Sequence, residues 1–253
     1  MIDIVSGHAA IDRYLTDGFE RVRGMSSKFA AGICGHLMRR QTELGIAGDL
    51  VEIGTYEGRF FIALTLGLQP GEHALGMDVF DWPDAGVQQR MVDNCAAHGL
   101  TPDRFTSWKA SSRSLAPADL LQKLGAGRKA RFIHVDSEHT PECLAHDLEL
   151  AHAALHERGV IALDDMLHPS YPMLLTAVID YLTRHPEMRV LCIIDRETIS
   201  AAAKFLICRT DVVPLYEQDL MESFARFHFI VGSMMMGHLT LVLTPDPTLP
   251  KLD

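Results

Sequence analysis

Short apolar runs and segments of helical spacing alternate along residues 48–209. The runs have the length and β-branched content of buried strands, and the segments between them repeat apolar residues at helical spacing. The predicted strands cover residues 50–53, 73–78, 105–109, 131–136, 160–165, 189–195 and 204–209, and predicted helices begin near residues 60, 88, 115, 140 and 173. Five strand-then-helix units followed by two strands predict an α/β fold with a doubly wound, mostly parallel, seven-stranded sheet.

Two further segments flank the predicted core, which spans residues 48–210. Residues 1–47 are expected to form a helical N-terminal cap that either closes the substrate side or covers a sheet edge. Residues 211–253 form a C-terminal extension, expected to pack on the core or in a subunit contact. Its apolar stretch 227–243 is short for a bilayer span and interrupted by histidine and glycine, so we expect no membrane role. The same stretch is compatible with a homodimer.

Composition narrows the class of protein. With 253 residues, 47% of them hydrophobic, the chain can bury a sizeable core. A formal net charge of -10 argues against a nucleic-acid binder, which needs basic stripes to follow phosphates. The five cysteines are scattered and form no Cys-x-x-Cys pair, and the N-terminus lacks a signal pattern. These features predict reduced thiols in a cytoplasmic protein.

The loop after the first strand carries the first chemical signal, Glu52-x-Gly54-x-x-x-Gly58. Glycine lets a backbone pass close to a ligand and adopt positive φ. The spacing differs from the Gly-x-Gly-x-x-Gly fingerprint of dinucleotide sites, and Glu52 would repel a pyrophosphate. A cofactor with an adenosine, an ammonium group and a sulfonium but no phosphate suits the loop better. The sequence therefore predicts S-adenosylmethionine as cofactor.

Polar residues recur at the ends of the predicted strands. They are Glu52 with Gly54, Asp78, Ser112, Asp136 and the pair Asp164–Asp165. Ligands of open parallel sheets collect at the carboxyl ends of the strands, so we expect these residues to share a site. Asp78 follows Gly54 at close to the ~20-residue offset at which an acid meets ribose hydroxyls. The alternative is an ordinary loop acid.

These motifs resemble class I S-adenosylmethionine-dependent methyltransferases over roughly residues 48–209. The stretch Gly48–Gly54 resembles the small-molecule O-methyltransferase branch, which includes macrocin O-methyltransferase and cephalosporin hydroxylase-like proteins. The resemblance implies a Rossmann-like sheet with one antiparallel strand near its end, and places Ser111 or Ser112 beside adenine. The predicted cofactor-binding residues are Glu52, Gly54, Thr55, Tyr56, Gly58, Asp78, Ser111, Ser112 and Asp136.

Three carboxylates, Asp136, Asp164 and Asp165, are candidate ligands of a divalent metal ion. Mg²⁺ prefers hard oxygen donors and leaves positions open for substrate oxygens. In the metal-dependent members of the resembled branch, an acid after the fourth strand and an acid pair after the fifth hold the ion, and these residues match those positions. The alternative is that the acid pair caps the next segment and Asp136 only contacts the cofactor.

The segment Asp136–Glu142 resembles the Asp-Gly-x-His-x-Tyr-Glu pattern of this branch, with serine in place of glycine and proline in place of tyrosine. His139 is the candidate general base, because imidazole titrates near neutral pH. Asp165 is the second predicted catalytic residue, and His168 is a secondary candidate. A histidine at a helix start can equally be structural.

The leading hypothesis is methyl transfer from S-adenosylmethionine to a hydroxyl of a small molecule, assisted by Mg²⁺ or another divalent ion. One alternative keeps the fold without the transfer, as a cofactor-binding partner or a hydroxylase-like member. A nicotinamide-dependent oxidoreductase is a third hypothesis, against which the missing Gly-x-Gly-x-x-Gly speaks. Sugar, polyketide, phenol and amino-acid acceptors all remain open.

Overall fold

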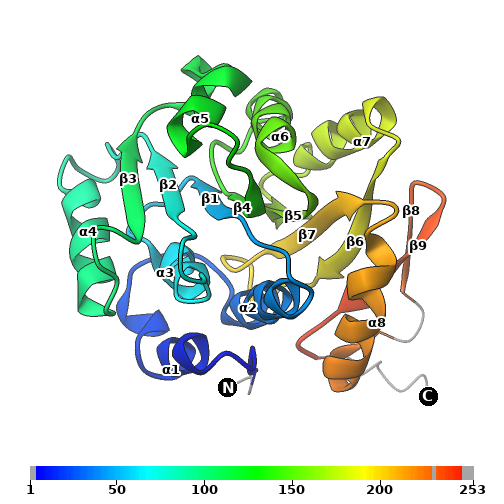
Figure 1. The fold of residues 1–253 in the computed structure, drawn as a ribbon. Coiled ribbons are helices and arrows are strands. Elements are labelled where there is room, and N and C mark those ends of the chain that lie inside the picture. Colours follow the sequence, from blue (N-terminus) through cyan, green and yellow to red (C-terminus); the bar gives the residue numbers. More distant parts are fainter. Residues whose placement is uncertain (1–3, 230–231, 247–253) are drawn as a thin grey trace.

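The computed structural model describes residues 4–229 and 232–246. Within these residues, nine strands form a sheet in the order β3-β2-β1-β4-β5-β7-β6-β9-β8 (Figure 1). The strands are β1 (Asp49–Ile53), β2 (Ala74–Asp78), β3 (Phe105–Lys109), β4 (Ala130–Val135), β5 (Leu155–Met166), β6 (Met188–Ile194), β7 (Ala203–Arg209), β8 (Ser233–Met235) and β9 (His238–Leu243). Strands β1 to β5 pair in parallel, and β7 lies antiparallel between β5 and β6. The doubly wound, mostly parallel α/β fold is confirmed.

The prediction of seven strands was too low, because the C-terminal extension adds two strands to the sheet. Strand β9 pairs in parallel with β6, with Cys192 opposite Leu241, and β8 folds back on β9. Without β9, strand β6 would leave its backbone N–H and C=O groups unpaired at the sheet edge. Met234 and Leu239 of the added hairpin are exposed. A homodimer stays a prediction, as do the domain boundaries, and residues 247–253 lie outside the described part.

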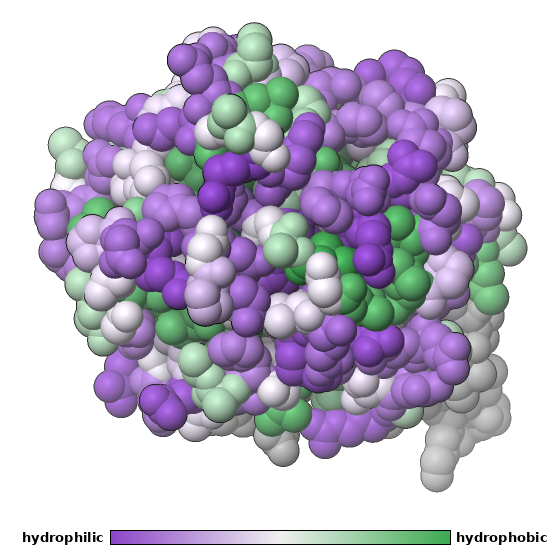
Figure 2. All heavy atoms as spheres, viewed as in Figure 1, coloured by the Kyte–Doolittle hydropathy of each residue, from purple (hydrophilic) through white to green (hydrophobic). Residues whose placement is uncertain are grey.

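Helices cover both faces of the sheet (Figure 1). One face carries α1 (Ala9–Asp17), α2 (Lys28–Glu43), α3 (Arg59–Thr65), α4 (Val87–Ala97) and α8 (Val213–Ser223), and the other carries α5 (Pro117–Leu124), α6 (Pro141–Ala154) and α7 (Leu174–Arg184). The surface seen in Figure 2 is mostly hydrophilic, with smaller apolar areas between. No helix among the described residues is both long and apolar enough to cross a membrane.

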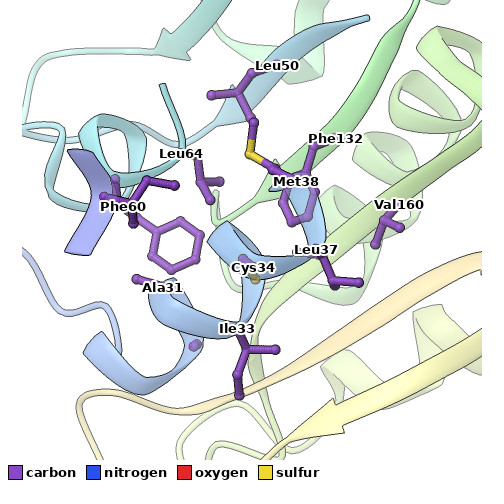
Figure 3. Close-up of a cluster of buried hydrophobic side chains, with 14 of the residues drawn as sticks. Ala31, Ile33, Cys34, Leu37, Met38, Leu50, Phe60, Leu64, Phe132 and Val160 are labelled. Carbon is purple, nitrogen blue, oxygen red and sulfur yellow. The ribbon is translucent and has the colours of Figure 1, made fainter. Parts of the chain in front are cut away.

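The larger apolar cluster lies under α2. Ser27 caps this helix by accepting a hydrogen bond from the backbone N–H of Ala30. Figure 3 shows side chains of α2 gathered with others from α3, β1, β4 and β5, among them Cys34, Leu37, Met38, Phe60, Leu50, Phe132 and Val160. Each fully buried side chain of this size contributes about 1.5–3 kcal/mol. Helix α2 therefore packs on a face of the sheet rather than covering an edge.

Helix α6 ends earlier than the pattern predicts. The sequence pattern predicts a helix up to Gly159, whereas α6 ends at Ala154 and β5 begins at Leu155. A Cβ at Gly159 would lie 2.7 Å from the Leu155 side chain and 3.1 Å from the Ala130 carbonyl oxygen. Glycine is thus needed here for close packing of chain segments, not to end a helix.

Candidate active site

The loop between β1 and α3 passes very close to the end of β4. Gly54 has φ +88°, and a Cβ there would lie 1.8 Å from the carbonyl oxygen of Asp136. Gly58 has φ +89° and precedes α3, and its N–H donates to the Thr55 carbonyl at 2.9 Å. Both glycines are therefore required by backbone geometry. The loop brings the ends of β1 and β4 together.

A cavity of about 360 Å³ lies at the carboxyl ends of the parallel strands. The predicted residues that line it are Gly54, Tyr56, Asp78, Ser111, Ser112, Asp136 and His139. Glu52 and Thr55 line a smaller adjoining cavity of about 30 Å³, which shares Gly54, Tyr56 and Asp136 with the first. Gly58 lines neither cavity. Most of the predicted cofactor residues thus meet in one place.

Asp78 holds the cofactor loop while it faces the cavity. Its Oδ2 accepts a hydrogen bond from the backbone N–H of Tyr56 at 2.8 Å, and its Oδ1 accepts one from Phe80 at 2.8 Å. A carboxylate has about four acceptor positions, so further positions stay available for a ligand. The geometry fits a residue that accepts hydrogen bonds from a vicinal diol.

Glu52 is buried with one carboxylate oxygen unpaired. Its Oε1 lies 2.7 Å from Nδ1 of His134, whereas Oε2 has no hydrogen-bond partner among the described residues. Burial, and next the charge of Asp136, raise the pKa of Glu52 well above its ordinary value. A buried acceptor without a partner is costly unless a ligand satisfies it. The ammonium group of an S-adenosylmethionine-type cofactor is chemically suited to do so.

The three predicted metal ligands do not form one cluster. Their donor atoms fall into two groups within 4.8 Å, one of Asp136, His139 and Asp165 and one of His134, Asp136 and Asp164. Asp165 Oδ2 lies 2.5 Å from Nε2 of His139, which in turn lies 3.9 Å from Asp136 Oδ1. Asp164 instead contacts the ammonium group of Lys204. Asp136 thus belongs to both groups, whereas Asp164 and Asp165 fall into different ones.

The backbone and the charges around Asp165 are unusual. Its φ is +55°, a region that non-glycine residues seldom adopt and that often marks functional sites. Burial alone would raise the pKa of this carboxyl, but the His139 imidazole lowers it below its ordinary value. Burial and the charge of Asp164 raise the pKa of Asp136 well above its usual range. A cation at this edge would relieve the repulsion among these carboxylates.

Part of the chain matches a known protein family. Residues 51–166 match a family described as a methyltransferase domain. Over these residues the chain is therefore similar to a methyltransferase domain. A comparison with curated proteins found no match.

Solved methyltransferases share the fold. The O-methyltransferase TomG of Streptomyces achromogenes, solved with S-adenosylmethionine, gives a TM-score of 0.56 at 17% identity over 79% of this chain and 89% of that one. CalS11, a TDP-rhamnose 3'-O-methyltransferase of calicheamicin biosynthesis, gives 0.56 at 17% identity, over 80% and 92%. A Bacillus cereus O-methyltransferase with S-adenosylhomocysteine gives 0.52 at 15%, over 80% and 91%. At this identity the likeness shows the fold.

Lys204 is a site residue that sequence reasoning missed. Its side chain is fully buried, and its Nζ contacts Asp164 Oδ2, lies 3.0 Å from His134 Nε2 and sits 4.5 Å from the centre of the Phe60 ring. Burial alone would lower the pKa of Lys204, but Asp164 and Asp136 raise it above its ordinary value. The two acids thus favour the charged form of Lys204 beneath the acidic edge.

Aromatic residues also line or adjoin the candidate site. The His139 ring stacks on Tyr171 with centroids 4.3 Å apart, and His168 lies 4.8 Å from the same ring. At the cavity, the ring centroids of Trp82 and Tyr56 lie 5.5 Å apart, and Trp82 is 63% exposed. Neither Trp82 nor Tyr171 ends a predicted strand, so the pattern of polar residues at strand ends does not indicate them.

Proposed function

We propose that the protein transfers a methyl group from S-adenosylmethionine to a hydroxyl of a small molecule. The observation that carries the proposal is the joint placement of Gly54, Asp78, Ser112, Asp136 and His139 around one cavity of about 360 Å³. The cavity edge is acidic and contains an unpaired buried carboxylate oxygen on Glu52. Such an edge favours a ligand that carries positive charge and no phosphate.

The chain's own residues would bind and orient the cofactor. Oε2 of Glu52 would accept a hydrogen bond from the ammonium group, and Asp78 would accept hydrogen bonds from the ribose hydroxyls. Ser111 and Ser112 line the part of the cavity assigned to adenine. When bound, S-adenosylmethionine supplies an electrophilic methyl group on its sulfonium. Correct positioning of the two reactants then provides much of the rate enhancement.

His139 is the proposed general base for the acceptor hydroxyl. Its ring lines the cavity and is held between Asp165, 2.5 Å from Nε2, and the stacked ring of Tyr171. Since Nε2 faces Asp165, Nδ1 would take the proton from the acceptor. A carboxylate beside one ring nitrogen fixes the orientation of the imidazole and stabilises its protonated form. Asp165 would therefore act as the residue that positions the base.

Asp136 and Asp165 are the residues that would hold a divalent metal ion. Both offer hard oxygen donors, and a carboxylate has two oxygens, so Asp165 can contact His139 and still supply a ligand. Asp164 is less suited to this role, because its Oδ2 contacts the ammonium group of Lys204. A bound ion would supply Lewis-acid activation of the acceptor hydroxyl by lowering its pKa.

The acceptor is proposed to be a hydroxylated natural-product or sugar derivative with an apolar part. Met25, Val79 and Trp82 line the cavity and keep large exposed fractions of 57%, 43% and 63%. Exposed apolar side chains at a cavity favour ligands with apolar surface. The structural relatives CalS11 and TomG belong to calicheamicin and tomaymycin biosynthesis, which supports this class of acceptor.

Isothermal titration calorimetry with S-adenosylhomocysteine tests the cofactor assignment. The wild-type protein is expected to bind it, and Asp78→Ala to bind about tenfold or more weakly, because contacts to the ligand and the loop are both lost. Asp84→Ala is the control, since Asp84 lies in the same region but is exposed and pairs with Arg90. No binding at millimolar ligand, or binding of NADH instead, would overturn the assignment.

A transfer assay tests the reaction itself. S-adenosylmethionine with a labelled methyl group is incubated with the protein, divalent ions and a panel of sugar, phenol and polyketide alcohols. Label in an ether product supports the proposal. Cofactor binding without transfer to any hydroxyl in a broad panel would favour the non-methylating alternative.

A further inference from the structure

Two histidines and a glutamate come together at the edge of the sheet opposite the cofactor cavity. His152 lies in the last turn of α6, His185 directly follows α7, and Glu187 precedes β6. A helix that follows a parallel strand returns to the opposite sheet edge, which separates this cluster from the carboxyl ends of the strands. The three side chains are half-buried. They belong to no part of the proposed methyl transfer.

The donor atoms have a spacing that suits a tetrahedral ion. Glu187 Oε1 lies 3.2 Å from Nδ1 of His185 and 3.8 Å from Nε2 of His152. Ligands bound to zinc at 2.0–2.1 Å with tetrahedral angles lie about 3.3 Å apart. One donor from each of the three residues falls within 4.8 Å of the others. The distance from His152 Nε2 to Glu187 Oε1 exceeds this spacing by about half an ångström.

The second nitrogen of each imidazole already has a partner. Nδ1 of His152 lies 2.8 Å from the Tyr181 hydroxyl, and Nε2 of His185 lies 3.3 Å from Glu149 Oε1. Arg184 contacts Glu149 and holds it in place. Metal-binding histidines generally donate their other N–H to such a partner, which fixes the ring and its tautomer. Here the supporting contacts leave the nitrogens that face Glu187 available.

The turn that carries two of the donors is held by its backbone. The N–H of His185 donates to the Tyr181 carbonyl at 2.9 Å, and the N–H of Met188 donates to the His185 carbonyl at 2.9 Å. The carbonyl of Glu187 accepts a hydrogen bond from Thr210 at 2.8 Å. Among the described residues, Glu187 has no lysine or arginine partner. Among the described side chains, its carboxylate forms ion pairs only with the two imidazoles.

We propose that His152, His185 and Glu187 form a zinc site that joins α6 to the α7–β6 turn. Neutral imidazoles and one carboxylate are a donor set that suits Zn²⁺ and related divalent transition metals better than Mg²⁺. Three protein ligands leave one position for water. The site links segments that are distant in sequence and lies away from the cofactor cavity, so its role is to stabilise the fold.

Calorimetric titration of ZnCl₂ into the chelator-treated full-length protein tests the proposal. His185→Ala and Glu187→Gln are each expected to lose one equivalent of zinc relative to wild type. His156→Ala is the matched control, because His156 is near in sequence but its Nδ1 accepts a hydrogen bond from Arg158. Asp165→Asn changes the acidic edge of the cavity and should still bind the equivalent of zinc assigned to His152, His185 and Glu187. The five cysteines are buried and do not compete.

Thermal unfolding supplies a second measurement. Zinc at about a hundredfold excess over Kd should raise the Tm of wild type by ~5–10 °C and leave that of Glu187→Gln unchanged. Glu187 is partly exposed, so this conservative variant is expected to fold. Equal zinc stoichiometry in wild type and Glu187→Gln, or no zinc bound by wild type, overturns the proposal.

Discussion

The ammonium group of Lys204 lies against the carboxylate of Asp164, and both side chains are buried. This contact divides the acid pair at the end of β5. Asp164 contacts the buried ammonium group of Lys204, while Asp165 contacts His139, which lines the cavity. Asp164 and Asp165 therefore have different partners, although the sequence alone does not distinguish them.

Replacing Lys204 with methionine is expected to destabilise the protein. The change leaves Asp164 without its cation, and breaking a buried pair from one side costs about 3–5 kcal/mol. Lys123→Met is the control, because Lys123 is exposed and its ammonium group lies over the Trp108 ring rather than beside a carboxylate. Urea unfolding measures both variants. In a double-mutant cycle, adding Asp164→Asn should recover part of the loss, and full additivity would contradict a direct pair.

Substitution of two glycines with the same φ distinguishes the cost of backbone strain from the cost of a steric clash. Gly54 and Gly71 both have φ +88°, but a Cβ at Gly71 meets nothing within 4 Å, whereas one at Gly54 meets the Asp136 carbonyl at 1.8 Å. Gly71→Ala should cost only about 1–2 kcal/mol, the cost of the left-handed backbone. Gly54→Ala should cost more than about 4 kcal/mol and abolish cofactor binding. Similar unfolding midpoints for the two variants would contradict the close approach.

The parallel core could be predicted because its signals are local. The strand at residues 105–109 has the predicted bounds, and the helix predicted to begin near residue 140 is α6, which Thr140 caps through the backbone N–H of Cys143. The gathering of Gly54, Asp78 and Asp136 followed from one rule about the carboxyl ends of parallel strands. Hydrogen-bonded pairing between strands that are distant in the sequence leaves no such local signal. Strand β9 was therefore missed as a partner of β6.

The rule that ligands collect at the carboxyl ends of strands does not identify Lys204, because that rule holds for parallel strands only. Strand β7 runs antiparallel to its neighbours, so its first residues, not its last, lie at the cofactor edge. A lysine in the apolar run Ala203–Arg209 was a usable signal, since buried lysines require a charged partner. The orientation of Asp164 and Asp165 could not be predicted. Consecutive residues at a strand end point to opposite sides, and only the pairing decides which side faces the site.

Glu52→Gln is expected to weaken cofactor binding without a loss of stability. The pKa of Glu52 is raised in the folded protein, so its ionised form lowers stability as the pH rises above the ordinary carboxyl value. A neutral amide removes that cost at neutral pH. It also removes a charge-assisted hydrogen bond to the ammonium group, so S-adenosylhomocysteine should bind about 10–100-fold more weakly.

Glu57→Gln is the matched control for Glu52. Glu57 is buried in the same loop, but Arg90 lies 2.7 Å and Arg23 3.5 Å from its Oε1. Its replacement should lower the Tm and leave the affinity within a few-fold. Reversed behaviour of the two variants would show that Glu52 serves the fold rather than the cofactor.

His139→Ala is expected to reduce turnover by about 10²–10⁴-fold, the usual contribution of a general base. Asp165→Asn should reduce kcat as well, because the imidazole loses the carboxylate that orients it. His168→Ala is the control, since His168 stacks on the same Tyr171 ring but is in neither group of donors around Asp136 among the described residues. Single-turnover kinetics with saturating cofactor measures the effect. Wild-type rates in His139→Ala would exclude this residue as the base.

Metal removal distinguishes ion-assisted transfer from transfer by the base alone. Asp136 and Asp165 group their oxygens within 4.8 Å beside His139, and burial with the charge of Asp164 raises the pKa of Asp136 well above its usual range. A divalent ion would relieve that repulsion and activate the acceptor. Chelation is therefore expected to lower turnover by at least about a hundredfold and to leave S-adenosylhomocysteine binding unchanged. Added Mg²⁺ or Mn²⁺ should restore turnover in wild type and in Glu187→Gln, but not in Asp165→Asn. If the chelated enzyme keeps its full rate, the His139–Asp165 pair suffices and the acidic edge serves only to hold the cationic cofactor.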